Sequence, residues 1–178
     1  MKRRALLALS LPAALLGAGC AEDPSQSYLW GVGDPIRGTA LNATRMLGDT
    51  SRWDGDPAGA AIAAAQLEFL ARSFREDPIW SVRASTATVQ ELQQAVLQMR
   101  EALGISPTAP NAVIEQLLRQ AGEALRAGSQ ARALAALSGP NFIVPPQEVL
   151  RRLGSLPRLN RVSAAAGMAG NDAFRRPR

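Results

Sequence analysis

The sequence predicts an all-α protein, a small irregular bundle of about five to seven helices with no substantial sheet. Alanine and leucine dominate, and hydrophobic residues make up 47% of the chain while aromatic residues make up only 4%. This composition favours helices. Apolar residues also recur at steps of three and four, which is the helical period. Finally, Asp-Pro pairs at 34, 56 and 77 are typical of helix starts, because aspartate accepts hydrogen bonds from free amides and proline suits the first turn.

The chain begins with a segment that reads as a leader. Lys2, Arg3 and Arg4 precede an apolar run at 5–16, and small residues follow at 17–19. A charged start, an apolar middle and a small-residue end are the three regions of a bacterial secretory signal. The apolar run is shorter than the ~20 residues that a membrane-spanning helix needs. We therefore expect residues 1–19 to be removed rather than to remain as a membrane span.

Cys20 gives this leader a more specific interpretation. Residues 16–20 read Leu-Gly-Ala-Gly-Cys and resemble the lipobox of bacterial lipoproteins, with Gly17 at a position where an aliphatic residue is usual. The resemblance implies that the Cys20 thiol carries acyl chains such as palmitate and that Cys20 becomes the first residue. Cys20 is also the only cysteine, so it cannot form an intramolecular disulfide. Acylation would give it a membrane foothold.

Lipidation predicts a protein of the cell envelope, anchored in a membrane and facing the periplasm. Ala21 stands where some bacterial lipoproteins carry an aspartate that retains them in the inner membrane, which favours the outer membrane. The alternative is ordinary cleavage after Ala21, which would give a soluble periplasmic protein. In both cases we expect residues 20–33, which are polar and turn-prone at their start, to form a tether. A helical domain is expected at 34–166.

The first two helices follow from their start signals. Asp34-Pro35 opens a helix that Gly48 ends, because glycine suits the residue after a helix. Asp56-Pro57 opens a second helix that runs to Arg75. Its alanine cluster at 60–65 predicts that a neighbouring helix approaches closely.

The third helical region spans 78–103, as one helix or as two with a break at Ser85-Thr86. Its second half has the cleanest period in the chain, so we expect it at the centre of the bundle. Arg100 falls among the residues expected to face solvent, and helical glutamates such as Glu68 are expected on solvated faces as well. The residues expected to face inward are Val89, Leu92, Val96, Met99 and Leu103.

Shorter elements complete the domain. Helices are expected at 111–127, after Ser129, at 146–153 and from Leu156-Pro157 onward. Between Pro140 and Pro145, the trio Phe142-Ile143-Val144 is strand-like but has no second strand to pair with. It therefore predicts an extended plug over the core. Residues 167–178 are expected to be a flexible basic tail.

Charge is spread unevenly along the chain. Residues 20–150 hold ten arginines and fourteen acids, for a net charge of −4, whereas 151–178 hold seven arginines and one acid, for +6. Because arginine suits phosphate and carboxylate, these arginines are candidates for contact with anionic lipid or an acidic partner. The alternative is a solvated helix face with a solubilising tail. This charge does not indicate nucleic acid. The seven are Arg151, Arg152, Arg158, Arg161, Arg175, Arg176 and Arg178.

The residue inventory excludes several kinds of chemistry. The chain has no histidine and no second cysteine, which removes the common catalytic triads and the usual zinc ligands. The acidic loop at Asp49, Asp54 and Asp56 lacks the further oxygen ligands and the closing glutamate of a calcium loop. We therefore predict no metal and no cofactor, and a non-catalytic binding or structural accessory that meets a membrane and an envelope protein. The sequence does not set an oligomeric state.

Two other functions stay open at this point. One is a carrier of a small apolar ligand between the alanine-rich helix and the helix at 89–103, which needs a cavity of ~300–1,000 Å³. The other is a cell-wall enzyme with two carboxylates ~5–9.5 Å apart. Its acids would come from Glu68, Glu76, Asp77, Glu91 and Glu101.

Overall fold

The computed structural model describes residues 34–175, and within that range the chain is all-α, as predicted. The leader, the tether, Cys20, Arg176 and Arg178 lie outside the described residues. None of the described helices combines the length and hydropathy of a membrane span. The elements are α2 (Pro35–Leu47), the 3₁₀-helix η1 (Thr50–Trp53), α3 (Pro57–Glu76), α4 (Trp80–Arg83), α5 (Thr86–Leu103), α6 (Asn111–Arg126), α7 (Gln130–Ala136), α8 (Pro146–Leu153) and α9 (Asn160–Phe174).

Of the Asp-Pro pairs at 34, 56 and 77, the first two start long helices, as predicted. Asp34 Oδ1 accepts hydrogen bonds from the amides of Ile36 and Arg37 at the start of α2, and Asp56 Oδ1 accepts one from Gly59 at the start of α3. Asp77 instead accepts hydrogen bonds from the amides of Ile79 and Trp80, in the turn that leads into the short α4.

Of the two alternatives for 78–103, the structure has two helices with the break at Ser85-Thr86: Ser85 caps the start of α5 and its Oγ accepts a hydrogen bond from the amide of Thr88. The separate turn of α4 raises the number of α-helices at 34–175 to eight, above the five to seven expected.

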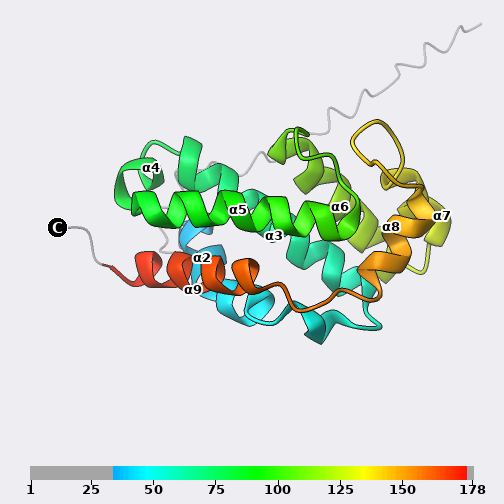
Figure 1. The fold of residues 1–178 in the computed structure, drawn as a ribbon, viewed down its shortest axis with the longest axis horizontal. Coiled ribbons are helices and arrows are strands. Elements are labelled where there is room, and N and C mark those ends of the chain that lie inside the picture. Colours follow the sequence, from blue (N-terminus) through cyan, green and yellow to red (C-terminus); the bar gives the residue numbers. More distant parts are fainter. Residues whose placement is uncertain (1–33, 176–178) are drawn as a thin grey trace, which may run out of the picture. The chain divides into compact units, whose positions relative to one another are not determined.

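The centre of the bundle is α3, not α5 as expected (Figure 1). α3 packs against α2, α4, α5, α6, α8 and η1. Its alanines at 60–65 are buried, so it has no solvent face along this stretch, whereas α5 has only one apolar stripe. The predicted close approach occurs with α6, where a Cβ added to Gly122 would lie 2.9 Å from the side chain of Ile62.

The last helix is longer than predicted, and the expected flexible tail from residue 167 is wrong for residues 167–174. These residues are the final turns of α9, which packs on α2 and α5. A Cβ added to Gly170 would lie 3.6 Å from the backbone of Ala40 in α2. The small residues that suggested an irregular tail therefore allow a close helix–helix contact.

A single threonine ties the loop before α9 to η1. The buried Thr50 donates its hydroxyl hydrogen to the carbonyl of Pro157 at 2.5 Å and accepts a hydrogen bond from the amide of Leu159 at 2.9 Å. This clamp occupies residues that were expected to begin the last helix, so α9 starts at Asn160 rather than near Leu156.

The strand-like trio does find a partner. Phe142 forms an isolated antiparallel bridge with Ile105, and the amide of Ile143 donates to the carbonyl of Gly104 at 2.9 Å. Phe142 is buried, as expected of a plug, but Ile143 is 68% exposed. The bridge therefore fixes an apolar side chain on the surface.

Candidate interaction surface

A buried ion pair joins α3 to α5. Arg100 Nε lies 2.8 Å from Glu68 Oε1, and Arg100 Nη2 lies 2.7 Å from Glu68 Oε2. Both side chains are at most 4% exposed. Asn111, at the start of α6, donates its amide to Glu68 Oε2 at 2.8 Å. The carboxylate thus links three helices.

Arg100 also holds the loop between α5 and α6. Its Nη1 donates to the carbonyls of Ala109 at 2.8 Å and Pro107 at 3.0 Å. Burial raises the pKa of the Glu68 carboxyl above its ordinary value, while hydrogen bonds from Arg100 and Asn111 oppose that shift. A buried ion pair is tolerated only when its remaining polar atoms are also hydrogen-bonded, and the loop carbonyls meet that condition here.

The expectation that Glu68 and Arg100 face solvent is therefore wrong. Their spacing could have predicted that both side chains face the core. Glu68 follows the buried Ala64 by four residues, and Arg100 follows the buried Val96 by four. That spacing places each charge on the apolar side of its helix. Nothing in the pattern pairs two residues 32 positions apart.

An apolar groove lies over this network, and we name it the α5 groove. It has a volume of about 340 Å³ and is lined by Leu97, Arg100, Glu101, Ile105, Pro107 and Ile143. Leu97 is 41% exposed, whereas Ile105 is buried. The groove is therefore open to solvent but stands on the part of the bundle that Arg100 holds in place.

The loop beside the α5 groove is further restricted at Gly104. This residue ends α5 with φ of 76°, a left-handed conformation that favours glycine. A Cβ there would lie 2.5 Å from a methyl group of Val144. Gly104 thus lets the extended segment 142–144 pack against the end of α5.

Two other hollows carry weaker arguments for binding. The larger, about 610 Å³ between α6 and α7, is lined by four alanines with Leu117, Gln120, Glu123 and Arg132, and none of these is an exposed large apolar side chain. The other, about 210 Å³, lies where α3 and α5 meet near Phe74 and Val89. It is the closest match to the predicted carrier cavity, and it is below the usual size of ligand pockets, ~300 Å³ and above.

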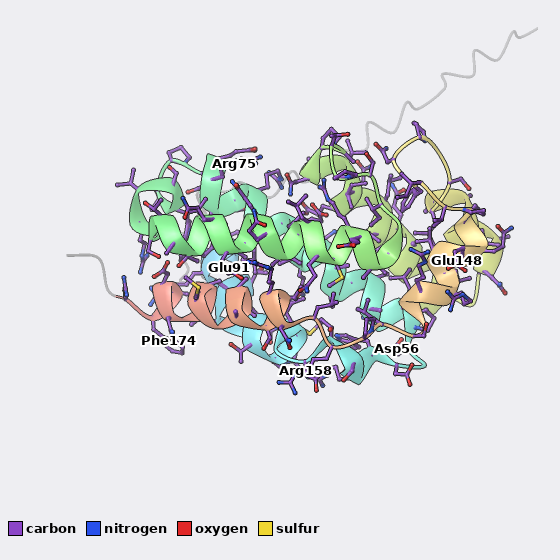
Figure 2. All side chains as sticks on the ribbon, viewed as in Figure 1. Asp56, Arg75, Glu91, Glu148, Arg158 and Phe174 are labelled. Carbon is purple, nitrogen blue, oxygen red and sulfur yellow. The ribbon has the colours of Figure 1, made fainter. Side chains whose placement is uncertain are left out.

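The predicted basic site divides into separate places. Arg151 and Arg152 both contact Glu148 at 2.7 Å, and their hydrogen bonds lower the pKa of Glu148 to about 2. Figure 2 shows Glu148 at one end of the helical unit and Phe174, the neighbour of Arg175, at the other.

The other described arginines of this set differ in their partners. Arg161 contacts Glu91 at 3.5 Å and Arg175 contacts Asp172 at 3.5 Å. Among residues 34–175, Arg158 has no ion pair within 4 Å. The described arginines therefore do not form a single patch, and most are already engaged by acids of the chain.

The predicted acidic loop is occupied by helix caps. Asp49 accepts hydrogen bonds from the amide and hydroxyl of Ser51, and these bonds lower the pKa of Asp49. Asp56 caps α3. In the part of the chain that the structure describes, no cluster of three metal-ligating side chains occurs.

Four of the five acids considered for catalysis are held by neighbours. Glu68 pairs with Arg100 as described, Glu76 pairs with Arg75 at 2.5 Å and Glu91 pairs with Arg161. Asp77 accepts hydrogen bonds from the amides of Ile79 and Trp80. Glu101, on the rim of the α5 groove, is exposed.

No protein-family model, curated protein or solved structure matches this chain. The arguments for function therefore rest on the residues and their geometry.

Proposed function

We propose that this chain is an envelope-anchored lipoprotein whose helical domain is a non-catalytic accessory that binds a partner protein through the α5 groove. The lipobox-like leader and Cys20 support the anchor. The observation that carries the binding role is the pair Leu97 and Ile143, large apolar side chains exposed by 41% and 68% on a rigid support. Exposed apolar side chains that line one concavity are typical of interaction sites.

The shape and chemistry of the α5 groove suit a protein side chain. Its volume of about 340 Å³ is at the lower limit for small-molecule pockets and it is open. Apolar walls with Glu101 on the rim match an apolar anchor residue next to a cationic one, a combination found at interface hot spots. Because Arg100 and the bridge to Phe142 already order the loop, binding would cost little additional ordering.

A photo-crosslinking amino acid at Ile143 tests the binding role in cells. We expect a discrete adduct that is lost in the variants Leu97→Asp and Glu101→Lys, because these place charge in the apolar wall or reverse the charge of the rim. The matched control carries the same probe at Val113 on α6, which is 39% exposed. An adduct that survives both substitutions, or that forms equally from position 113, contradicts the role of the groove.

The anchor is tested by the intact mass of the protein purified from membranes. We expect a chain that begins at Cys20 and carries acyl chains, and a Cys20→Ser variant that takes up no labelled palmitate. Recovery of the product in the cytosol with Met1 still attached would contradict the anchor.

A further inference from the structure

A second set of exposed apolar side chains lies at the end of the helical unit away from α7. Ile79, just before α4, and Val82, on α4, are 61% and 85% exposed, and Phe174 at the end of α9 is 71% exposed. Figure 2 shows Phe174 at this end of the unit. Arg83 of α4 donates a hydrogen bond to the carbonyl of Arg175. The two segments are therefore neighbours, and we name this region, Ile79–Arg83 with Phe174 and Arg175, the α4 end.

The chain enters the helical unit at the α4 end. Trp80 Nε1 donates a hydrogen bond to Asp34 Oδ2 at 2.6 Å, so the first described residue lies against α4. Thirteen residues, 21–33, separate Cys20 from Asp34, so fourteen Cα–Cα steps join the two. A fully extended chain of that length spans at most about 50 Å. An anchor at Cys20 thus keeps the α4 end close to the bilayer, where even weak contacts are promoted by a high effective concentration.

The polar groups at the α4 end add to this argument. Asp34, Asp77 and Asp172 use their carboxylates for hydrogen bonds to backbone amides or to the Trp80 indole. The guanidinium of Arg83 lies over the ring of Trp80, 5.0 Å from its centroid.

The exposed charges around this end are partly paired: Glu76, just before α4, pairs with Arg75, and Arg175 contacts Asp172 at 3.5 Å. Arg175 is exposed by 71% and is followed in the sequence by Arg176 and Arg178. Apolar side chains bordered by arginines are the composition of surfaces that bind membranes containing anionic lipid.

We infer that the α4 end docks on the bilayer surface, with Ile79, Val82 and Phe174 among the lipid headgroups and the arginines against anionic lipid. This inference rests on the lipid anchor of the proposed function and adds an orientation to it. The N-terminal end of α5 then faces the membrane. Leu97 lies eleven residues further along that helix, about 16 Å at 1.5 Å per residue. The docked orientation thus holds the α5 groove above the bilayer, where a partner protein can reach it.

A spin label at position 82 tests the docking. The full chain with Val82→Cys is acylated, purified, labelled with a nitroxide and reconstituted in vesicles of phosphatidylcholine and phosphatidylglycerol. Collisions with oxygen report on lipid, and collisions with a water-soluble nickel complex report on water. The control carries the label at Ala131→Cys on α7, an exposed position at the opposite end of the unit (Figure 1). We expect an oxygen-to-nickel ratio several-fold higher at 82 than at 131.

A second variant separates docking from a general effect of charge. The pair Ile79→Asp and Phe174→Asp, which changes only exposed residues, should lower the ratio at 82 to the value at 131. Ile143→Asp, an equally exposed apolar residue in the α5 groove, should leave the ratio unchanged.

The outcomes distinguish the inference from the proposal on which it rests. If the parent chain is acylated and the ratios at 82 and 131 are equal, the docking is wrong and the anchor stands. If labels at 82 broaden each other through dipolar coupling, a second copy covers this face and the docking is again wrong. If the parent chain takes up label at Cys20, that thiol is not acylated, and both the anchor and the docking are overturned.

Discussion

The molecule contains the same chemical pair in two environments. In the core, Arg100 donates two hydrogen bonds to Glu68, at 2.7 and 2.8 Å. On α8, Arg151 donates two hydrogen bonds to Glu148, both at 2.7 Å. The geometries are nearly equal, but the Glu68 side chain is 2% exposed and that of Glu148 is 30% exposed. Burial raises the pKa of Glu68, whereas hydrogen bonds lower the pKa of Glu148. Geometry alone therefore does not show how much an ion pair contributes to stability. When one partner is removed, the cost depends on whether the charge that remains is buried or solvated.

The largest effect is expected from Arg100→Leu. The change leaves Glu68 buried without its cation and removes the donor to the carbonyls of Pro107 and Ala109. Breaking a buried pair from one side typically costs ~3–5 kcal/mol, and we expect a loss of that order in urea unfolding at pH 7. The control is Arg151→Leu on the surface, for which we expect no measurable change in midpoint. Equal urea midpoints for Arg100→Leu and Arg151→Leu would show that the buried pair contributes no more to stability than the surface pair.

The pH dependence of Arg100→Leu has a defined sign. Without the cation, desolvation dominates, so the pKa of Glu68 in the folded state lies above that of the unfolded chain. The folded state then holds a proton that the unfolded chain releases. Stability is therefore full below the unfolded pKa and is lost as pH rises through the folded pKa. We expect the deficit relative to the parent to be smaller at pH 4 than at pH 7, and a deficit that shrinks with rising pH would contradict this account.

A double change, Glu68→Leu with Arg100→Leu, is expected to have an intermediate effect. Aliphatic side chains often replace a buried ion pair without loss. Here, however, the loop carbonyls and the amide of Asn111 would lose their partners, and an unsatisfied buried group costs ~1–3 kcal/mol. We expect the double variant to be more stable than Arg100→Leu and less stable than the parent in urea unfolding. Full recovery of parental stability would show that the loop does not depend on Arg100.

The smallest effect is expected from Glu148→Gln. The lowered pKa of Glu148, about 2 against an ordinary 4.5, means that its contribution is present above pH 4.5 and is lost as pH falls toward 2. Because the group is solvated, we expect equal thermal midpoints for variant and parent at pH 7. In acid, protonation of Glu148 weakens its hydrogen bonds with Arg151 and Arg152, so this pH dependence has the opposite sign to that of Glu68, and the two midpoints should remain equal. A clear midpoint difference at pH 7 would contradict the view that the pairs of Glu148 with Arg151 and Arg152 are solvated surface interactions.

Local signals in the sequence predicted most of the helices. Asp34 and Asp56 cap where they were expected to, Ser85 marks a true break, and α8 spans Pro146–Leu153 as predicted. These features depend on residues within one or two turns of each other. The leader and Cys20 lie outside the described residues, and their interpretation stays a prediction.

The features that the sequence did not predict depend on residues far apart in the chain. The end of α9 was assigned to a tail because the sequence from Gly167 onward is small, polar or basic, yet the segment is helical and packs on α2 and α5. The α5 groove was missed because it combines Leu97 with Ile143. Alternation along the extended trio could have placed Ile143 opposite to Phe142, but it could not have identified the bridge to Ile105.

The contact between α2 and α9 has a consequence for the timing of folding. It joins the first and the last helix of the described chain, and the fully buried Ala40 lies beside Gly170. A polypeptide is synthesised from its N-terminus, so α2 can pack against α3 early, but its contact with α9 cannot form until residues 160–174 have left the ribosome. Complete closure of the bundle must therefore wait until α9 has been synthesised. If the chain is exported, as the proposed function requires, this late contact keeps the bundle incomplete until the chain reaches the translocation machinery.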